Sequence, residues 1–210
     1  MPRQDREFAV PSIYQLKPRF QALLRPTVQR LYERGISANQ VTVAAAVVSL
    51  LLGLLLAWLP QVTWLFILVP VWMLLRMALN AVDGMLAREF GQQSKLGAYL
   101  NELCDLVADA ALYLPFALLP GVSPTLVVLV VLAAVISEYA GVMGPLAGAS
   151  RRYDGPMGKS DRAFAFGVLG TGVALGLLAA SWINGLLLVI LLLSLYTLYN
   201  RVRHGLAETR

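Results

Sequence analysis

The residues best suited to chemistry lie between positions 80 and 105, where polar side chains interrupt apolar sequence. Asn80, Asp83 and Gly84 share one face of a helix, because each residue advances a helix by about 100°. Asn101 and Asp105 share a face of a following helix in the same way. Ionisable groups among apolar helices are costly and usually face a cavity. Two facing stripes of carboxylate and amide oxygens would suit a divalent metal ion, which prefers oxygen ligands.

The composition indicates which elements position these stripes. Of the 210 residues, 58% are hydrophobic and 14% are charged, which is typical of a polytopic membrane protein. Six apolar segments each approach the roughly 20 residues that cross the hydrocarbon core of a bilayer. These segments are residues 41–59, 62–82, 96–118, 124–147, 162–181 and 183–200. The sequence therefore predicts an all-α fold, a bundle of six transmembrane helices.

The second and third segments are expected inside this bundle. Arg76 lies in the second segment, and the third carries Asn101, Glu102, Asp105 and Asp109. These residues make both segments too polar to face lipid on every side.

Basic residues divide the connections into two kinds. The connections near Pro60, Pro120 and Ser181 carry no charge. By the positive-inside rule, the basic connections and both termini are expected in the cytoplasm, in a bacterial-type cytoplasmic membrane. The net charge of +5 follows from this asymmetry and does not indicate nucleic-acid binding. The basic residues concerned are Arg3, Arg6, Lys17, Arg19, Arg25, Arg30, Arg34, Arg88, Lys95, Arg151, Arg152, Lys159, Arg162, Arg201, Arg203 and Arg210.

The sequence before the first apolar segment predicts a kinked amphipathic helix. Pro18 and Pro26 interrupt it, and it either lies in the cytoplasmic membrane interface or packs on the bundle as a lid. The sequence therefore predicts three regions in the chain. They are residues 1–36 before the membrane, a membrane domain of residues 37–202, and a tail of residues 203–210. The apolar residues at helical spacing are Ile13, Leu16, Phe20, Leu23, Val28 and Leu31.

The cysteine content and the N-terminal sequence argue against three further features. Cys104 is the only cysteine, so neither a disulfide framework nor a cysteine-based zinc site is expected. The charged N-terminal stretch lacks the apolar core of a cleavable signal peptide.

The polar stripes resemble the signature of the CDP-alcohol phosphatidyltransferase family. That signature reads Asp-x-x-Asp-Gly-x-x-Ala-Arg, eight residues, then Gly-x-x-x-Asp-x-x-x-Asp. Asn80 and Asn101 stand at the first and third Asp positions, where they keep the shape and remove the charge. The residues that match the signature are Asp83, Gly84, Ala87, Arg88, Gly97 and Asp105.

The resemblance implies a reaction and roles for these residues. An alcohol would attack the β-phosphorus of a CDP-linked lipid such as CDP-diacylglycerol, and CMP would leave. Two divalent ions, Mg²⁺ or Mn²⁺, would grip the pyrophosphate, and Asp105 would act as the general base. The implied metal ligands are Asn80, Asp83, Asn101 and Asp105; Gly84, Ala87, Arg88 and Gly97 would contact the nucleotide.

Two further segments resemble family motifs. In the stretch Ser37 to Thr42, Asn39 and Thr42 would contact the nucleotide, although a helix N-cap by Ser37 explains much of the pattern. Gly158-Lys159 resembles a step that binds an acceptor or lipid phosphate, with Arg151 and Arg152 nearby.

Two isolated polar residues outside these motifs have weaker expectations. Glu138 is expected to be a structural hydrogen-bond partner or to line the acceptor pocket. His204 is expected to be a solvated residue of the tail.

The two asparagines leave several interpretations open. Two carboxylates offset fewer metal charges than four, although Glu102 and Asp109 are candidates to compensate. The chain would then be a natural branch with an altered metal shell, a natural protein without catalysis, or an engineered inactive variant. Asp83 and Asp105 also have a simpler interpretation as a buried ion pair with Arg76.

The predicted function is phosphatidyl transfer to an alcohol in phospholipid biosynthesis, by a homodimer like its relatives. The acceptor is open: glycerol 3-phosphate, inositol phosphate and serine all fit. Alternatives are a non-catalytic lipid- or nucleotide-binding relative and, ranked last, a cation- or proton-coupled transporter. The relay of that transporter would be Asp83, Asp105, Asp109 and Glu138.

Overall fold

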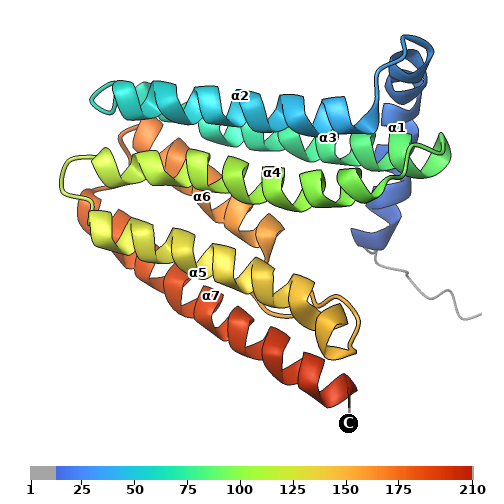
Figure 1. Ribbon diagram of the computed structural model, residues 1–210. Coiled ribbons are helices and arrows are strands. Elements are labelled where there is room, and N and C mark those ends of the chain that lie inside the picture. Colours follow the sequence, from blue (N-terminus) through green and yellow to red (C-terminus); the bar gives the residue numbers. More distant parts are fainter. Residues whose placement is uncertain (1–12, 210) are drawn as a thin grey trace, which may run out of the picture.

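The computed structural model describes residues 13–209, and in this part of the chain all regular secondary structure is helical. Seven α-helices and three short 3-10 helices occur there (Figure 1). In chain order they are α1 (Ile13–Glu33), α2 (Ala38–Trp58), η1 (Thr63–Ile67), α3 (Leu68–Glu89), α4 (Lys95–Tyr113), η2 (Leu114–Leu118), α5 (Pro124–Met143), η3 (Gly144–Ala147), α6 (Lys159–Ala174) and α7 (Ala180–Glu208).

Four helical stretches in the described residues are long and apolar enough to cross a membrane. They are Ala38–Trp58, Thr63–Glu89, Pro124–Ala147 and Ala180–Glu208. The other two predicted spans became helices that do not qualify by length and composition. α4 carries four charged residues, and α6 has only 16 residues. In the described residues the structure therefore confirms the all-helical fold, and by length and composition it supports four of the six predicted spans.

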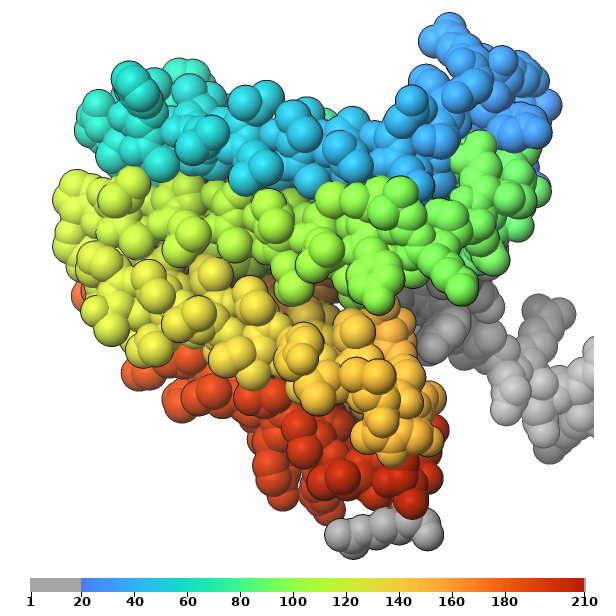
Figure 2. All heavy atoms as spheres, viewed as in Figure 1, coloured from blue at the N-terminus to red at the C-terminus, as the bar shows by residue number. Residues whose placement is uncertain are grey.

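The helices form two groups, and contacts of α5 with η2 and α4 join them. α2 packs against α3 and α4, α5 packs against α7, and α6 packs against α3. Figure 2 shows α2, α4, α5 and α7 as adjacent bands of one face. Gly53 allows α2 to approach α4 closely, because a Cβ atom there would meet the carbonyl of Ala111.

The largest apolar core lies towards one end of the bundle. The ring of Tyr113 stacks on that of Phe166, with 3.8 Å between their centroids. Phe116 packs edge-on against both Phe66 and Phe166. Such aromatic contacts hold α4 and η2 against α6 and η1.

The uncharged and the charged connections lie at opposite ends of the bundle (Figure 1). The uncharged ones are residues 59–62, 119–123 and 175–179. The other end carries α1, Arg88, Lys95 and the loop of residues 148–158.

Helix caps fix where the helices of the charged end begin. The Ser37 hydroxyl accepts a hydrogen bond from the backbone of Gln40, whose side chain accepts one from the backbone of Ser37. Ser94 accepts from the backbone N–H of Gly97 and so starts α4. These caps satisfy amides that have no partner inside a helix.

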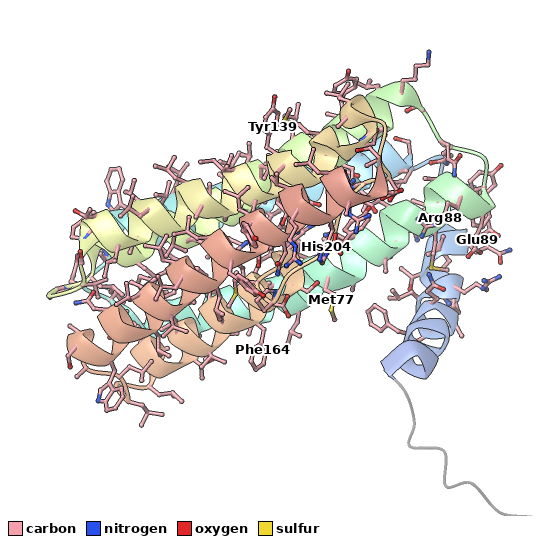
Figure 3. The ribbon with its side chains drawn as sticks, turned by 90° about the horizontal axis from the view of Figure 1, so that it is seen from below. Met77, Arg88, Glu89, Tyr139, Phe164 and His204 are labelled. Carbon is pink, nitrogen blue, oxygen red and sulfur yellow. The ribbon has the colours of Figure 1, made fainter. Side chains whose placement is uncertain are left out.

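α1 is a single helix that packs on the bundle, as in the lid alternative. Val28 is fully buried against Val82 and Leu86, whereas Leu23 is 74% exposed. Arg25 forms an ion pair of 3.1 Å with Glu89 at the end of α3, beside α1 in Figure 3. The interfacial location of α1 stays a prediction.

Some residues named in the sequence analysis lie outside the described part of the chain. They are residues 1–12, with Arg3 and Arg6, the side chains of Ile13, Leu16, Lys17, Pro18 and Arg19, and Arg210.

Candidate functional site

A polar cavity of about 440 Å³ lies at the charged end of the bundle, between the start of α2, the end of α3 and the start of α4. All six residues that the sequence assigned to the nucleotide line it. They are Asn39, Thr42, Gly84, Ala87, Arg88 and Gly97. Asp83, Asn101, Glu102 and Arg151 also line this polar cavity. The structure thus brings together residues from three helices and one loop.

Two glycines leave the space that this cavity needs. A Cβ atom at Gly97 would lie 2.8 Å from the side-chain oxygen of Asn39 and 3.0 Å from the hydroxyl of Ser94. A Cβ atom at Gly84 would lie 2.8 Å from the guanidinium of Arg88. These glycines therefore let polar side chains lie against the helix backbone.

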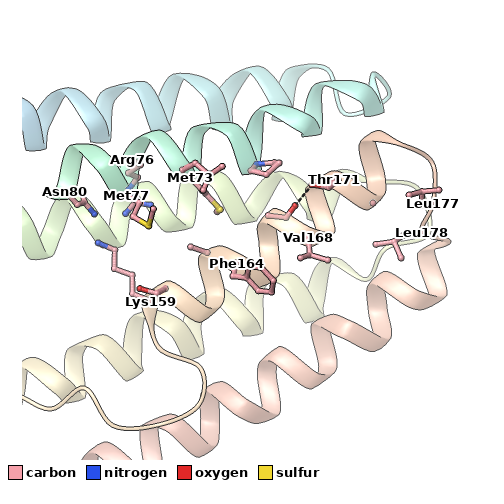
Figure 4. Close-up of a pocket in the computed structure, with 16 residues that line it drawn as sticks. Met73, Arg76, Met77, Asn80, Lys159, Phe164, Val168, Thr171, Leu177 and Leu178 are labelled. Atoms are coloured by element: carbon pink, nitrogen blue, oxygen red, sulfur yellow. Dashed lines mark hydrogen bonds between the residues drawn. The ribbon is translucent and has the colours of Figure 1, made fainter. Parts of the chain in front are cut away.

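An apolar groove of about 800 Å³ runs between α3 and α6 (Figure 4). Met73, Met77, Phe164 and Val168 line it, and Phe164 is 74% exposed. One end is polar, and Arg76, Asn80 and Lys159 lie there. The sequence did not reveal this apolar groove, because its lining residues read as ordinary lipid-facing positions.

Asp105 lies between residues of the polar cavity and residues of the apolar groove. It lies one helical turn after Asn101, which lines the polar cavity. Its carboxylate forms ion pairs with Lys159 and, at 3.0 Å, with Arg76, and both cations belong to the end of the apolar groove.

Arg76 is 5% exposed and also pairs with Asp109. The buried pair that the sequence suggested for Arg76 thus forms with Asp105. Asp83, the other suggested partner, is not among its ion pairs in the described residues.

Asp83 has a different environment from Asp105. It accepts a hydrogen bond of 2.7 Å from the Thr42 hydroxyl. Among the described residues it forms no ion pair with Lys or Arg. Asp83 is therefore a carboxylate that faces the polar cavity with a neutral partner.

The four predicted metal ligands do not all line one cavity. Asp83 and Asn101 line the polar cavity, Asn80 lines the apolar groove, and Asp105 lies between two cations. Within residues 13–209, no three His, Cys, Asp or Glu side chains are grouped as a metal site.

The two candidate compensating acids already have arginine partners. Glu102 receives two hydrogen bonds from Arg151, one of them 2.8 Å long. Asp109 is 6% exposed and paired with Arg76. Their charges are therefore balanced by the protein itself.

Arg152 lies apart from the other predicted phosphate contacts. It pairs with Asp154 at 2.8 Å and with Glu208 at 2.5 Å, and it is not among the residues that line either cavity. The hydrogen bond from Arg152 lowers the pKa of Asp154 to about 2.

His204 also contacts Asp154, at 3.0 Å. The expectation of a solvated histidine did not include this contact, because Asp154 belongs to the loop of residues 148–158, which packs against α7 only in the folded chain. The sequence analysis missed Asp154, which carried no motif.

Glu138 is the centre of a buried ion cluster. It accepts a hydrogen bond of 2.6 Å from Arg162 and pairs with Arg201 at 3.1 Å. Both arginines are at most 2% exposed. Arg162 also donates to the carbonyl of Met157 at 2.7 Å, so the cluster fixes the chain just before Lys159. These contacts agree with the structural expectation for Glu138.

Comparisons with known proteins identify the family of this chain. The sequence profile of the CDP-alcohol phosphatidyltransferase family matches residues 35–200. The inner membrane protein YnbA of Escherichia coli K12 is 47% identical over 192 residues, which cover 91% of this chain and 95% of that protein. The archaetidylinositol phosphate synthase of Aeropyrum pernix is 32% identical over 155 residues, covering 71% and 75%.

Solved structures share the fold. The Mycobacterium tuberculosis phosphatidylinositol phosphate synthase with CDP-DAG bound has a TM-score of 0.70 at 18% identity, covering 86% of this chain and 92% of that one. The same synthase with manganese and citrate has a TM-score of 0.69 at 18% identity, covering 86% and 87%. The residues that match the family profile include Asp105 and all residues that line the polar cavity and the apolar groove. This chain belongs to the CDP-alcohol phosphatidyltransferase family.

Proposed function

We propose that this protein transfers a phosphatidyl group from a CDP-linked lipid to an alcohol and releases CMP. The observation that carries the proposal is that Asp105 contacts Lys159 and Arg76 of the apolar groove and lies one helical turn from Asn101 of the polar cavity. A CDP-linked lipid has a polar nucleotide, apolar chains and a pyrophosphate between them. The polar cavity suits the nucleotide and the groove suits the chains, since apolar surface favours apolar partners. The pyrophosphate would then lie beside Asp105.

Asp105 is the proposed general base. Its carboxylate would take the proton of the alcohol while the alcohol oxygen bonds to the β-phosphorus. The bond from that phosphorus to the bridging oxygen would break, and CMP would carry the electrons away. Lys159 would move from Asp105 towards the anionic pyrophosphate, which frees one carboxylate oxygen to accept the proton.

A divalent ion is part of the proposal, since a relative was solved with manganese. Asp83 and Asn101 offer hard oxygen ligands from the same cavity, which suit Mg²⁺ or Mn²⁺. Bound there, the ion would neutralise charge on the pyrophosphate. Asn80 and Asp105 stand at the other two ligand positions of the family signature, but Asn80 lines the apolar groove and Asp105 is ion-paired with Arg76 and Lys159.

Phosphate contacts follow from the same geometry. Arg151 lines the polar cavity and Lys159 lies at the end of the apolar groove, so both are proposed contacts for a charged acceptor or for the lipid phosphate. Arg152 is not proposed for this role, because Asp154 and Glu208 hold it elsewhere.

Topology and assembly are proposed with the function. Helices α2 to α7 would all cross a bacterial inner membrane, with both termini and the polar cavity on the cytosolic side. The position of the basic residues at one end supports this orientation. A homodimer is proposed by analogy with the family.

Purified protein with CDP-diacylglycerol, Mn²⁺ and a panel of acceptors tests the proposal. One relative is named an archaetidylinositol phosphate synthase and another a phosphatidylinositol phosphate synthase. Inositol phosphate therefore heads a panel that also contains glycerol 3-phosphate and serine. The expected result is CMP release that depends on one acceptor. No CMP release with any acceptor, while CDP-diacylglycerol still binds, would favour a non-catalytic relative instead. That alternative rests on Asn80 and Asn101. A transport relay is not favoured, because Asp105, Asp109 and Glu138 are each ion-paired.

A further inference from the structure

We infer that the ammonium of Lys159 takes the place of one of the two divalent ions, so that this site binds a single divalent ion. The inference rests on the proposed function for the identity of the substrate. It concerns how the positive charge beside the pyrophosphate is supplied.

The first step is the charge of the donor set. Two divalent ions bring four positive charges, and the family signature opposes them with four carboxylates. In this chain only Asp83 and Asp105 remain, because Asn80 and Asn101 are neutral. Amide oxygens still ligate a hard cation, but ligand charge tunes the affinity.

The second step is that Asp105 is already neutralised. Arg76 and Lys159 both contact its carboxylate, and Arg76 also contacts Asp109. The two acids and two bases of this cluster sum to zero charge. A divalent ion placed at Asp105 would therefore meet two nearby positive charges and no net negative charge. Like charges at such a distance repel strongly where water is scarce.

The third step is that Asp83 remains available for one ion. It faces the polar cavity together with Asn101, and its contact there is the neutral hydroxyl of Thr42. The two carboxylates are thus in unequal positions. Asp83 supports a metal ion, and Asp105 supports the ammonium.

The position of Lys159 is built by the fold. Lys159 is the first residue of α6. The side chain of Asp161 accepts a hydrogen bond of 2.9 Å from the backbone of Gly158, and the buried Arg162 holds Met157. Glu138 in turn anchors Arg162. The ammonium is therefore directed to Asp105 by a fixed helix start.

Arg76 and Lys159 have different parts in this arrangement. Arg76 is 5% exposed and bridges two acids, so it is a fixed counter-charge. Lys159 has a 32% exposed side chain at the mouth of the apolar groove. The Lys159 ammonium is a compact point charge on a flexible stem, so it can move with the phosphate charge during the reaction.

The test counts Mn²⁺ bound to the purified full-length protein by titration with electron paramagnetic resonance, without any turnover. The unmodified protein is expected to bind one Mn²⁺ per chain. The double variant Asn80→Asp/Asn101→Asp is expected to bind a second ion. Adding Lys159→Met to that double variant should tighten the second site by about tenfold or more, because a nearby positive charge is removed. Lys95→Met is the matched control, since Lys95 also lies at the charged end. It should change neither the number of bound Mn²⁺ ions nor the affinity of the second site.

Two outcomes would overturn the inference. One is two Mn²⁺ per chain, or none, in the unmodified protein. The other is a second site in the double variant whose affinity for Mn²⁺ is unchanged by Lys159→Met. Failure of the proposed function is a separate result: one bound Mn²⁺ without CMP release would refute catalysis and leave the metal count intact.

Discussion

The carboxylate of Asp105 on α4 and the ammonium of Lys159 at the start of α6 form an ion pair. Lys159 lines the apolar groove, and Asn101, one helical turn before Asp105, lines the polar cavity. It joins the helix that carries the proposed base to the helix that forms one wall of the groove. The same pair therefore bears on substrate position, on proton transfer and on the number of metal ions.

Gly97→Ala is expected to weaken binding of the CDP-linked lipid. The added methyl would lie 2.8 Å from the side chain of Asn39, which must then move out of the polar cavity. Losing one such contact costs about 1–2 kcal/mol, or roughly tenfold in KM for the lipid. Gly185→Ala is the control, because nothing lies within 4 Å of a Cβ atom there. An unchanged KM in Gly97→Ala would show that Asn39 and Gly97 do not shape the nucleotide site.

Glu138→Gln is expected to destabilise the protein. Arg162 and Arg201 would keep their charge in a buried site and lose the carboxylate that balances it. Breaking a buried ion pair in this way costs about 3–5 kcal/mol. The measurement is the unfolding temperature in detergent, with Glu208→Gln as a control at a more exposed ion pair. Equal unfolding temperatures for the two variants would contradict a structural role for Glu138.

Opposite sidedness is expected for cysteines introduced at Lys95 and Pro120. Both positions are exposed, whereas the neighbouring Val122 is buried and would label poorly. In a variant that lacks Cys104, a membrane-impermeant thiol reagent applied to sealed cells should label position 120 and spare position 95. Labelling of both positions from the same side would contradict the proposed topology.

Local features of the site were predictable from the sequence. Helical spacing placed Asp83 and Gly84 on one face and Asn101 and Asp105 on another, because periodicity depends only on neighbouring residues. The family signature then brought in Asn39, and the structure places it in the same polar cavity as Asp83.

Long-range features were not predictable in the same way. The pairs that Asp105 makes with Arg76 and Lys159 join residues far apart in the chain. They depend on how α3, α4 and α6 pack, which no local pattern specifies. The partners of Glu138 were missed for the same reason, since Arg162 and Arg201 resembled ordinary topology signals.

Helix boundaries differed where backbone conformation decides them. The segment predicted at 162–181 ends as α6 at Ala174, and Gly176 then adopts a φ of +65°. The segment predicted at 96–118, by contrast, is helical throughout, since α4 continues directly into η2, which ends at Leu118. Hydropathy continues past Ala174 and does not register the turn there, because apolar residues follow the helix end.

The central claim is that phosphatidyl transfer takes place at Asp105, and Asp105→Asn tests it most directly. CMP release is measured at saturating CDP-diacylglycerol and acceptor, beside equilibrium binding of CDP-diacylglycerol. Loss of the general base should lower the rate of CMP release by roughly 10²–10⁴-fold, while the lipid still binds. An unchanged rate of CMP release in Asp105→Asn would contradict the account.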